Sequence, residues 1–484
     1  MTLTGTPLRR AKIVATLGPA TDDLHVLSDL IRAGVDVVRV NFSHGSFEDH
    51  ARRVQLVRDA AASVGRCVSV LGDLSGPKIR IDRFLDGKIQ LEEAAPFTLD
   101  VSLDPNGGTQ HTVGCAYKEL PNDVAAGDVL LLNDGLIVLT VLSIEGPRVH
   151  TRVAVGGELS NNKGLNRRGG GLSAGALTDK DRADILIAAR LEVDYLAVSF
   201  PRSAEDMLEA RRLLLAAGGS ARLVAKIERA EAILHLDAIV EASDAVMVAR
   251  GDLGVEVGYA ELTGLQKQII QTARHHFKAV ITATQMMESM IQNPVPTRAE
   301  VSDVANAVLD GTDAVMLSAE SAVGKYPVKA VEAMVQVIVG AEKYQIAKGG
   351  RTRQRFERKE FQGADEAIAM AVMYTANHMD VKAIVALTES GSTPLWMSRM
   401  RSDIPIYAFT RFESTRRRVT LYRGVYPVAF DVTHTDPAIL YPSIFRRAVE
   451  LGLCAEGDRI IVTKGEHSGV SGGTNSMKIL EVRF

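Results

Sequence analysis

Short apolar runs, rich in β-branched residues, recur along the first two thirds of the chain. Most are separated by stretches with helical periodicity, such as Asp23–Ala33 and Asp179–Leu191. Short buried strands that alternate with helices indicate βαβ units and a parallel sheet. Eight such units close a (β/α)8 barrel, so we predict an α/β fold of this kind. The eight runs are Ile13–Gly18, Asp36–Asn41, Cys67–Asp73, Tyr195–Phe200, Leu223–Glu228, Ala245–Asp252, Ala279–Gln285 and Ala314–Glu320.

The connection between the third and fourth of these strands is unusually long. It contains about 120 residues, whereas ordinary connections contain a few. Alternating apolar and polar positions at Lys88–Leu91, Val129–Leu132 and Leu136–Val141 are typical of half-buried strands. We therefore expect residues 74–169 to form a small all-β domain inserted into a barrel of residues 1–73 and 170–345.

A third unit is expected after the cationic run at 351–359. Apolar strands alternate with helical stretches there, which is typical of an open α/β sheet. We therefore predict a C-terminal α/β domain over residues 346–484. Its expected helices are Asp365–Asn377 and Pro437–Leu451, and its expected strands are Ala383–Thr388, Ile404–Thr410, Val425–Phe430 and Arg459–Thr463.

Composition excludes several classes of protein. The 484 residues are 46% hydrophobic and 24% charged, which is ordinary globular usage. The net charge of −3 gives no cationic field for nucleic acid or a membrane surface, so neither partner is expected. The three cysteines lie far apart in the sequence and the first residues lack an apolar signal core, so we expect a cytoplasmic protein.

Polar residues end several of the predicted strands, and in a barrel the strand ends meet at the active site. Lys226 and Glu228 are two residues apart on one strand and therefore share a face. With Asp252 from the next strand, they offer two carboxylates and no nearby His or Cys, a set that favours Mg²⁺. A lysine beside such a cation stabilises a phosphoryl group in transfer. The alternative for these residues is a structural lysine–carboxylate pair.

Other polar positions suit an anionic substrate. Arg39 and Arg80 have the fixed charge and planar donors that recognise phosphate or carboxylate, although a strand arginine is usually an ion-pair partner. Thr284 offers a hydroxyl for a carboxylate or for a proton-relay water. The chain has no GxxxxGK[ST] loop, and its Gly169-x-Gly171 motif follows no clear strand. A bound nucleotide would therefore be held without a P-loop or a dinucleotide fingerprint.

At this point the motifs resemble those of the pyruvate kinase family. The resemblance covers nearly the whole chain in order, and the block from 283 to 311 is very specific. The resembling stretches are Lys12–Thr21, Arg39–Gly45, Asp73–Arg80, Asn133–Leu136, Lys226–Glu228, Val248–Gly254, Ala283–Met290, Pro296–Gly311 and Ser471–Met477.

The resemblance implies a glycolytic phosphotransferase that transfers a phosphoryl group from phosphoenolpyruvate to ADP, giving pyruvate and ATP. By the family pattern, Lys226, Arg39 and Thr284 are catalytic. Gly251 and Asp252 join these three in binding the substrate. The pattern implies that Glu228 and Asp252 hold Mg²⁺, with Mn²⁺ as a substitute.

The resemblance also gives the inserted domain a role as a lid. By the family pattern, the nucleotide contacts come from the barrel and from the inserted domain. Closing such a lid would exclude water from the reaction. The nucleotide-binding residues expected in this way are Asn41, His44, Arg80 and Lys163.

The chain departs from the family pattern at the monovalent-cation site. Members that need K⁺ bind it with residues that match Asn41, Ser43 and Asp73, and with a threonine where this chain has Leu74. They also carry a glutamate where this chain has Lys78. An ammonium beside a bound K⁺ would repel it, so we expect Lys78 to substitute for K⁺ and the enzyme to work without it. A surface lysine with no role is the alternative.

The C-terminal domain resembles the family's effector module. A loop that follows a strand and precedes a helix presents backbone N–H groups to a phosphate. Relatives that respond to fructose 1,6-bisphosphate usually carry a basic residue where this chain has Glu389. The carboxylate would repel a second phosphate, so we expect activation by a sugar monophosphate or AMP. The expected loop residues are Thr388, Ser390, Gly391, Ser392 and Thr393.

Two other functions remain open on the residues alone. A Mg²⁺-dependent lyase or aldolase acting on phosphoenolpyruvate or pyruvate would share the metal pair and an arginine, but would consume no ADP. A non-catalytic metabolite sensor on the same architecture would not need Lys226 or the two carboxylates, and this chain has all three. The family further implies a homotetramer.

Overall fold

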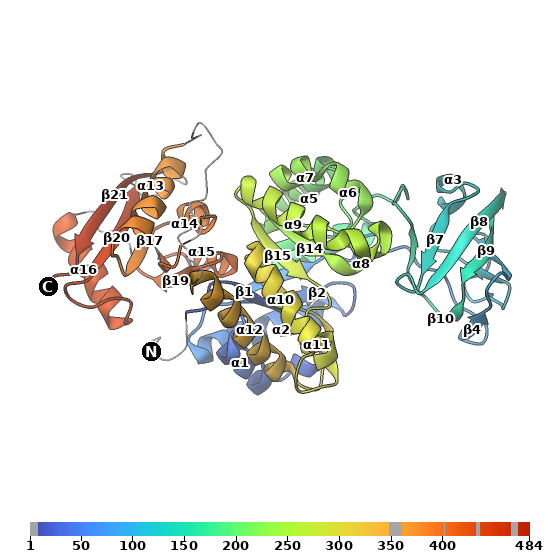
Figure 1. Cartoon of the computed structure of the whole chain (residues 1–484), viewed down its shortest axis with the longest axis horizontal. Helices are drawn as coiled ribbons and strands as arrows, with labels where there is room; N and C mark the ends of the chain where they lie inside the picture. The colour runs from blue at the N-terminus through green and yellow to red at the C-terminus, as the bar shows by residue number, and fades with distance from the viewer. Residues whose placement is uncertain (1–7, 348–360, 362, 401, 432–435, 466–472) are drawn as a thin grey trace.

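The computed structural model describes residues 8–347, 361, 363–400, 402–431, 436–465 and 473–484. Figure 1 shows three bodies in a row, with the barrel in the middle, the inserted domain on the right and the C-terminal domain on the left. The cationic run at 351–359 and the first two residues of the Ser471–Met477 motif, Ser471 and Gly472, lie outside the described residues. The inserted and C-terminal domains therefore contact opposite ends of the barrel.

A closed parallel barrel forms the centre of the molecule, as the sequence predicted. Within residues 8–347, its strands follow the order β1-β16-β15-β14-β13-β12-β3-β2. Residues from both faces of every strand are buried, as expected where helices cover a parallel sheet. The strands are β1 (Lys12–Thr16), β2 (Val37–Asn41), β3 (Ser69–Asp73), β12 (Tyr195–Val198), β13 (Arg222–Ile227), β14 (Ala245–Ala249), β15 (Ala279–Ala283) and β16 (Ala314–Leu317).

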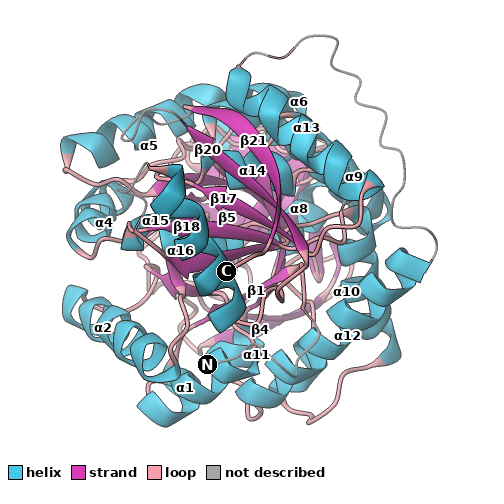
Figure 2. Ribbon diagram, turned by 90° about the vertical axis from the view of Figure 1, so that its left-hand side faces the viewer, coloured by secondary structure: helices cyan, strands magenta, loops and turns pink. Residues whose placement is uncertain are grey.

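Helices surround this barrel, and Figure 2 looks along it from the side of the C-terminal domain. Ser46, Thr178 and Thr297 begin three of them with reciprocal capping boxes, which satisfy otherwise unpaired N–H groups. The helices are α1 (Leu24–Ala33), α2 (Phe47–Val64), α4 (Asp179–Arg190), α5 (Ala204–Ala216), α6 (Ala230–Leu234), α7 (Leu236–Ala242), α8 (Arg250–Val257), α9 (Tyr259–His275), α10 (Arg298–Asp310), α11 (Ala319–Ala322) and α12 (Pro327–Ala347), with short 3₁₀ turns η1 (Pro19–Thr21) and η2 (Glu288–Ile291).

The inserted domain is a β-rich unit with its own apolar core. A six-stranded sheet has the order β11-β7-β8-β9-β5-β6, and β10 pairs with β4 beside it. A tight turn at Asn133-Asp134-Gly135, where all three residues have positive φ, joins β7 to β8. The elements are β4 (Lys88–Leu91), β5 (Pro96–Asp100), β6 (Thr112–Gly114), α3 (Leu120–Asp123), β7 (Val129–Leu132), β8 (Ile137–Glu145), β9 (Arg148–Val155), β10 (Gly157–Ser160) and β11 (Leu165–Arg167).

The C-terminal domain is an open α/β sheet of order β19-β18-β17-β20-β21 among its described residues. Its first four strands in this order are parallel and β21 is antiparallel to β20. No helix in the described parts of the chain has both the length and the apolar character to span a bilayer. The elements are α13 (Ala364–His378), β17 (Ala383–Leu387), α14 (Ser392–Ser398), β18 (Ile406–Thr410), α15 (Glu413–Arg418), η3 (Val419–Leu421), β19 (Val425–Ala429), α16 (Pro437–Glu450), β20 (Arg459–Gly465) and β21 (Thr474–Glu481).

The C-terminal domain packs against the N-terminal ends of the barrel strands. Lys12, the first residue of β1, donates a hydrogen bond of 2.6 Å to the Val425 carbonyl. The hydroxyl of Tyr195, the first residue of β12, donates to the Arg418 carbonyl at 2.7 Å. One apolar cluster continues from the barrel interior into this domain. The N-terminal end of the barrel is therefore covered, and the C-terminal ends of the strands remain for chemistry.

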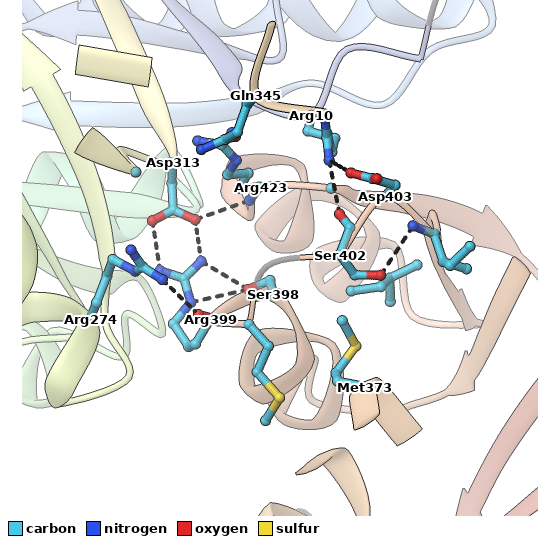
Figure 3. Close-up of a pocket in the computed structure, with 15 residues that line it drawn as sticks. Arg10, Arg274, Asp313, Gln345, Met373, Ser398, Arg399, Ser402, Asp403 and Arg423 are labelled. Atoms are coloured by element: carbon cyan, nitrogen blue, oxygen red, sulfur yellow. Dashed lines mark hydrogen bonds and ion pairs between the residues drawn. The ribbon is translucent and has the colours of Figure 1, made fainter. Parts of the chain in front are cut away.

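A buried ion pair joins the two domains at this junction, and Figure 3 shows it with its neighbours. Arg399 is bidentate to Asp313, with a distance of 2.6 Å between Nη1 and Oδ2. Both side chains are almost fully buried, at 3% and 1% exposed. Asp313 also accepts hydrogen bonds from the backbone N–H groups of Val280 and Arg423. Its charge therefore has donors from the barrel and from the C-terminal domain.

Removing one partner of this buried pair is expected to destabilise the protein strongly. In Arg399→Ala, the Asp313 carboxylate stays buried without its cation, so the free energy of unfolding should fall by about 3–5 kcal/mol. Urea unfolding followed by circular dichroism measures this change. The control is Arg483→Ala, which removes an exposed pair with Glu481 and should leave the midpoint unchanged. An equal, small effect of both variants would contradict a structural role for the buried pair.

Candidate active site

The candidate site lies where the barrel strands end, on the side opposite the C-terminal domain. Arg39 and Asn41 belong to the end of β2, and Asp73 is the last residue of β3. Lys226 lies near the end of β13, and Glu228 follows that strand. Parallel strands of a closed barrel present these ends at one rim, which brings together residues far apart in the sequence.

Lys226 is the centre of a buried charge cluster. Its Nζ atom lies 3.4 Å from Oε2 of Glu228 and 3.5 Å from Oδ1 of Asp73. The two carboxylate side chains are each 1% exposed, and that of Lys226 is 14% exposed. The ammonium and Glu228 thus face each other from one strand, as the two-residue spacing predicted. The ammonium is still open enough for a small anion to reach.

The charges in this cluster shift one another's protonation. Burial raises the pKa of Glu228 to about 7, because Lys226 only partly offsets burial while Asp252 and Asp73 add negative charge nearby. Burial opposes the charge of Lys226, but Asp73 and Glu228 outweigh burial and hold its pKa above the ordinary value. Burial likewise opposes ionisation of Asp73, yet Lys226 and Arg39 keep its pKa below the ordinary value. Asp73 is therefore a fixed negative charge between two cations.

Arg39 is held at the same rim by Asp73. Its Nε atom donates to Asp73 Oδ2 at 2.5 Å, and its Nη1 atom donates to the Thr16 hydroxyl at 3.2 Å. The side chain comes from β2, whose register sets Arg39 opposite Leu71 and Asn41 opposite Asp73 on β3. The guanidinium therefore lies beside the Lys226 cluster through a shared carboxylate.

Thr284 and Gly251 meet next to this cluster. The Gly251 N–H donates to the Thr284 hydroxyl at 2.8 Å, and that hydroxyl donates to the Ala283 carbonyl at 2.6 Å. Thr284 has φ of +69°, which is unusual for a β-branched residue and marks a constrained turn after β15. The first turn of α8 thus carries Gly251 and Asp252 toward the residue that ends the neighbouring strand.

Arg250, a residue that the sequence reasoning did not assign, holds this turn in place. It donates to the carbonyls of Ala283 and Thr284 at 3.2 and 2.6 Å and pairs with Asp303 at 2.7 Å. The sequence shows that Arg250 precedes Gly251. Only the packing of the barrel brings its guanidinium to the carbonyls at the end of β15.

Lys78 contacts a different carboxylate from the one expected. The predicted monovalent-cation site consists of Asn41, Ser43 and Asp73, yet the Lys78 ammonium pairs with Oδ1 of Asp252 at 2.9 Å. Asp73 is paired with Arg39 and Lys226 instead. Lys78 therefore brings its charge to a candidate metal ligand, and two other cations surround the carboxylate expected to bind K⁺.

The four residues expected to bind nucleotide fall into two pairs. Arg80 and Lys163 lie side by side in the inserted domain, where Arg80 pairs with Gly164 and the Ile81 N–H bonds to the Lys163 carbonyl at 3.0 Å. Asn41 ends β2, and His44 follows in an exposed loop. The first pair therefore belongs to the inserted domain, and the second to the barrel rim.

The expected effector loop lies between β17 and α14, far from the barrel rim. The Thr388 hydroxyl accepts the Gly391 N–H at 2.9 Å, and the hydroxyls of Ser390 and Ser392 lie 2.9 Å apart. The Thr393 hydroxyl is buried and lies 2.7 Å from that of Thr474. The loop is thus held by its own side chains, with Thr393 directed into the domain.

The residues present fit a hard divalent cation. Oε2 of Glu228 and Oδ1 of Asp73 are buried, have no hydrogen-bond partner and lie 3.4 and 3.5 Å from the Lys226 ammonium, so each keeps capacity to act as an oxygen ligand. Among the described residues, no group of three or more His, Cys, Asp or Glu side chains is arranged to hold a metal. Mg²⁺ needs only one or two carboxylates, because water and substrate oxygens complete its shell. Glu228 and Asp252 supply that number.

Two residues that the sequence reasoning missed brace the charged pair. Ser199 Oγ accepts a hydrogen bond from Lys226 Nζ at 2.7 Å, and the Phe200 N–H donates to Glu228 Oε1 at 2.8 Å. Both follow β12, which the sequence reasoning treated only as a barrel strand. The sequence shows that both residues lie at a strand end. An apolar strand that ends in Ser-Phe does not indicate contacts with charged side chains.

Sequence models of known families match almost the whole chain. The model described as the pyruvate kinase barrel domain matches residues 8–331, and that of the pyruvate kinase alpha/beta domain matches residues 366–480. Among individual proteins, the chain is 54% identical over 479 residues to "Pyruvate kinase II" of Salmonella typhimurium, covering 98% of this chain and 99% of the relative. It is 54% identical over 464 residues to the pyruvate kinase of Haemophilus influenzae, covering 95% and 96%.

A solved structure agrees with these sequence matches. A crystal structure of a pyruvate kinase from Cryptosporidium parvum superimposes with a TM-score of 0.93 at 32% sequence identity, covering 98% of this chain and 97% of that one. The similarity therefore extends through all three bodies described above.

Proposed function

The chain belongs to the pyruvate kinase family, and we propose that the cluster of Lys226, Glu228 and Asp252 carries its reaction. The family's phosphotransferase reaction moves a phosphoryl group between phosphoenolpyruvate and ADP. The observation that supports this location is the Lys226 ammonium 3.4 Å from a buried Glu228 oxygen that has no hydrogen-bond partner. A cation paired with a buried carboxylate oxygen that lacks a hydrogen-bond donor, at a strand rim, suits a metal-assisted transfer of phosphate.

In the proposed reaction, an ADP β-phosphate oxygen attacks the phosphorus of phosphoenolpyruvate. The P–O bond to the enol oxygen breaks, and its electron pair leaves with the enolate. Lys226 and Arg39 bind the oxygens of the phosphoryl group in transfer and stabilise its negative charge. Asp73 holds both cations in position, because its carboxylate contacts Arg39 at 2.5 Å and Lys226 at 3.5 Å.

Glu228 and Asp252 would hold the divalent cation, Mg²⁺ or Mn²⁺. When bound, the cation would supply Lewis-acid stabilisation of the phosphoryl oxygens. The burial of Glu228 keeps its carboxylate out of bulk water, and the Phe200 N–H fixes one of its oxygens and leaves the other available. Glu228 is thus a preorganised ligand, whereas Asp252 would share its carboxylate between the cation and Lys78, which lies 2.9 Å from its Oδ1 atom.

The substrate carboxylate is placed at Thr284 and Gly251. The Gly251 N–H donates to the Thr284 hydroxyl at 2.8 Å, and that hydroxyl donates to the Ala283 carbonyl at 2.6 Å. The two groups therefore lie together, and each would exchange its present acceptor for the substrate carboxylate. The enolate left by phosphoryl transfer takes a proton at its methylene carbon to become pyruvate. Thr284 is placed to deliver that proton, either directly or through a water.

The nucleotide is assigned to the space between the barrel rim and the inserted domain. Asn41 and His44 approach it from the barrel, while Arg80 and Lys163 approach it from the inserted domain. Closing that domain over the site would exclude water, which otherwise would accept the phosphoryl group.

Three finer properties are also proposed. Lys78 replaces K⁺ as a source of positive charge at the rim, where its ammonium pairs with Asp252 at 2.9 Å and not with the residues expected to bind K⁺. The Thr388–Thr393 loop binds a sugar monophosphate or AMP as activator. The Glu389 carboxylate opposes a second phosphate, and Arg411, 3.6 Å away, offsets part of its charge. By family resemblance, the assembly is a homotetramer.

The first test is a lactate-dehydrogenase-coupled assay with phosphoenolpyruvate, ADP and Mg²⁺. We expect pyruvate formation to match ADP consumption one to one. Glu228→Gln and Asp252→Asn should each lower kcat/KM by about 100-fold or more, because each removes a metal ligand. Asp237→Asn, which changes an exposed carboxylate of the same barrel, is the control and should be unchanged. Pyruvate release without ADP consumption would indicate a lyase, and no turnover would indicate a sensor.

The second test concerns the monovalent cation. Initial rates in Tris, Na⁺ and K⁺ buffers of equal ionic strength should agree within about twofold, since Lys78 already supplies the charge. Lys78→Glu should then create a requirement for K⁺. Lys88→Glu makes the same charge change at an exposed lysine of the inserted domain and should not. Strong activation of the unaltered enzyme by K⁺ would contradict the proposal.

The third test concerns the activator. Glucose 6-phosphate, ribose 5-phosphate, AMP and fructose 1,6-bisphosphate are each titrated at low phosphoenolpyruvate. We expect a monophosphate to lower the half-saturating substrate concentration and the bisphosphate to act weakly. Ser392→Asp should weaken the monophosphate response by charge repulsion, and Glu389→Arg should strengthen the bisphosphate response. If none of the four compounds changes the curve, the loop has no effector role.

A further inference from the structure

Ser199 lies where three barrel strands meet beneath the charge cluster. It follows β12, whose register places Val198 opposite Ala225 on β13 and Ala197 opposite Asp73 on β3. Ser199 is therefore next to Lys226 on one side and next to Leu74 on the other. Its side chain is 1% exposed, so its hydroxyl must find its partners inside the protein.

The hydroxyl has two partners, which fix its direction. It donates its proton to the Leu74 carbonyl at 2.8 Å and accepts from Lys226 Nζ at 2.7 Å. A hydroxyl has one proton and two lone pairs. Because that proton is engaged by Leu74, a lone pair must face the ammonium. The contact is therefore a directed hydrogen bond from a charged donor, which is stronger than one between neutral groups.

Ser199 differs from the other partners of Lys226 in its charge. Among the described contacts of the ammonium, Glu228 and Asp73 are carboxylates at 3.4 and 3.5 Å, and Ser199 is neutral. Glu228 is required elsewhere as a proposed metal ligand, and Asp73 is shared with Arg39. A neutral anchor holds the amine while leaving its full positive charge for the phosphoryl group.

We propose that Ser199 is a positioning residue that aims Lys226 at the phosphoryl group in transfer. The next residue supports the same arrangement, because Phe200 holds Glu228 through its backbone N–H. Phe200 has φ of +56°, a strained conformation for a bulky residue, which turns this short segment at the strand end. One dipeptide thus fixes the cation and the anion of the site, and this inference rests on the proposed role of Lys226.

Packing alone would be a simpler role for Ser199. The loop that leads to the inserted domain passes close by, since a Cβ atom on Gly76 would lie 2.7 Å from that of Ser199. Alanine keeps the Cβ atom and removes only the hydroxyl. The comparison of Ser199→Ala with the unaltered enzyme therefore separates the hydrogen bond from the packing.

The experiment measures kcat, the KM for ADP and the thermal midpoint of Ser199→Ala in the full chain. Loss of an orienting hydrogen bond should lower kcat about 10- to 100-fold, with KM for ADP within twofold. The matched control is Ser243→Ala, another buried barrel serine, whose hydroxyl bonds only to the Ile239 carbonyl among the described contacts. It should keep full kcat. A similar loss of kcat in both variants, or a collapse of the midpoint in Ser199→Ala alone, would overturn the proposal.

A double-mutant cycle tests whether Ser199 acts through Lys226. Lys226→Arg should lower kcat on its own, and adding Ser199→Ala should cause little further loss, because the group to be aimed has changed. Equal fold-losses in both backgrounds would overturn the positioning role. If Lys226→Arg and Lys226→Met both keep full activity, the proposed function fails; if they lose activity and Ser199→Ala does not, only the present inference fails.

Discussion

A buried carboxylate held between two cations organises the rim of this barrel. Asp73 is almost fully buried, and it contacts Arg39 from β2 and Lys226 from β13 while belonging to β3 itself. Burying a single carboxylate is costly, but the two cations that contact Asp73 stabilise its negative charge and keep it ionised. The cations are in turn fixed in direction. Asp73 therefore holds the Arg39 and Lys226 side chains beside each other at the rim.

The opposite end of the barrel uses the same physical device for a different purpose. Asp313 is buried against Arg399 of the C-terminal domain, and Lys12 reaches the Val425 carbonyl close by. These contacts cover the N-terminal ends of the strands with protein. A barrel closed at that end has one rim open to ligands, and the inserted domain joins the chain at that open rim. The two added domains therefore contact different ends of the barrel, and the proposed site lies at the end that the C-terminal domain leaves open.

Inside the rim, short strands determine which side chains meet. Ser199 and Phe200 add neutral donors and acceptors around charges that other strands supply. Ser199 gives the Lys226 ammonium a partner besides the carboxylates. The Phe200 N–H binds only one oxygen of Glu228, so the other oxygen can bind another partner. Arg250 supports the neighbouring turn in a similar way, because it donates to the Ala283 and Thr284 carbonyls at the end of β15. Residues with no proposed contact to the substrate, namely Ser199, Phe200 and Arg250, thus hold the charged residues and the turn of the candidate site in position.

The sequence by itself determined the barrel, because buried strands alternating with helices leave few other arrangements, and its motifs identified the family. The spacing of Lys226 and Glu228 also predicted their shared face, since side chains two apart in a strand point the same way. Only the tertiary structure decided which strand ends are neighbours. It placed Lys78 on Asp252 rather than at the expected K⁺ ligands, and it brought Ser199 to Lys226. Those contacts depend on how strands, loops and helices far apart in the chain are brought together, which local pattern does not encode.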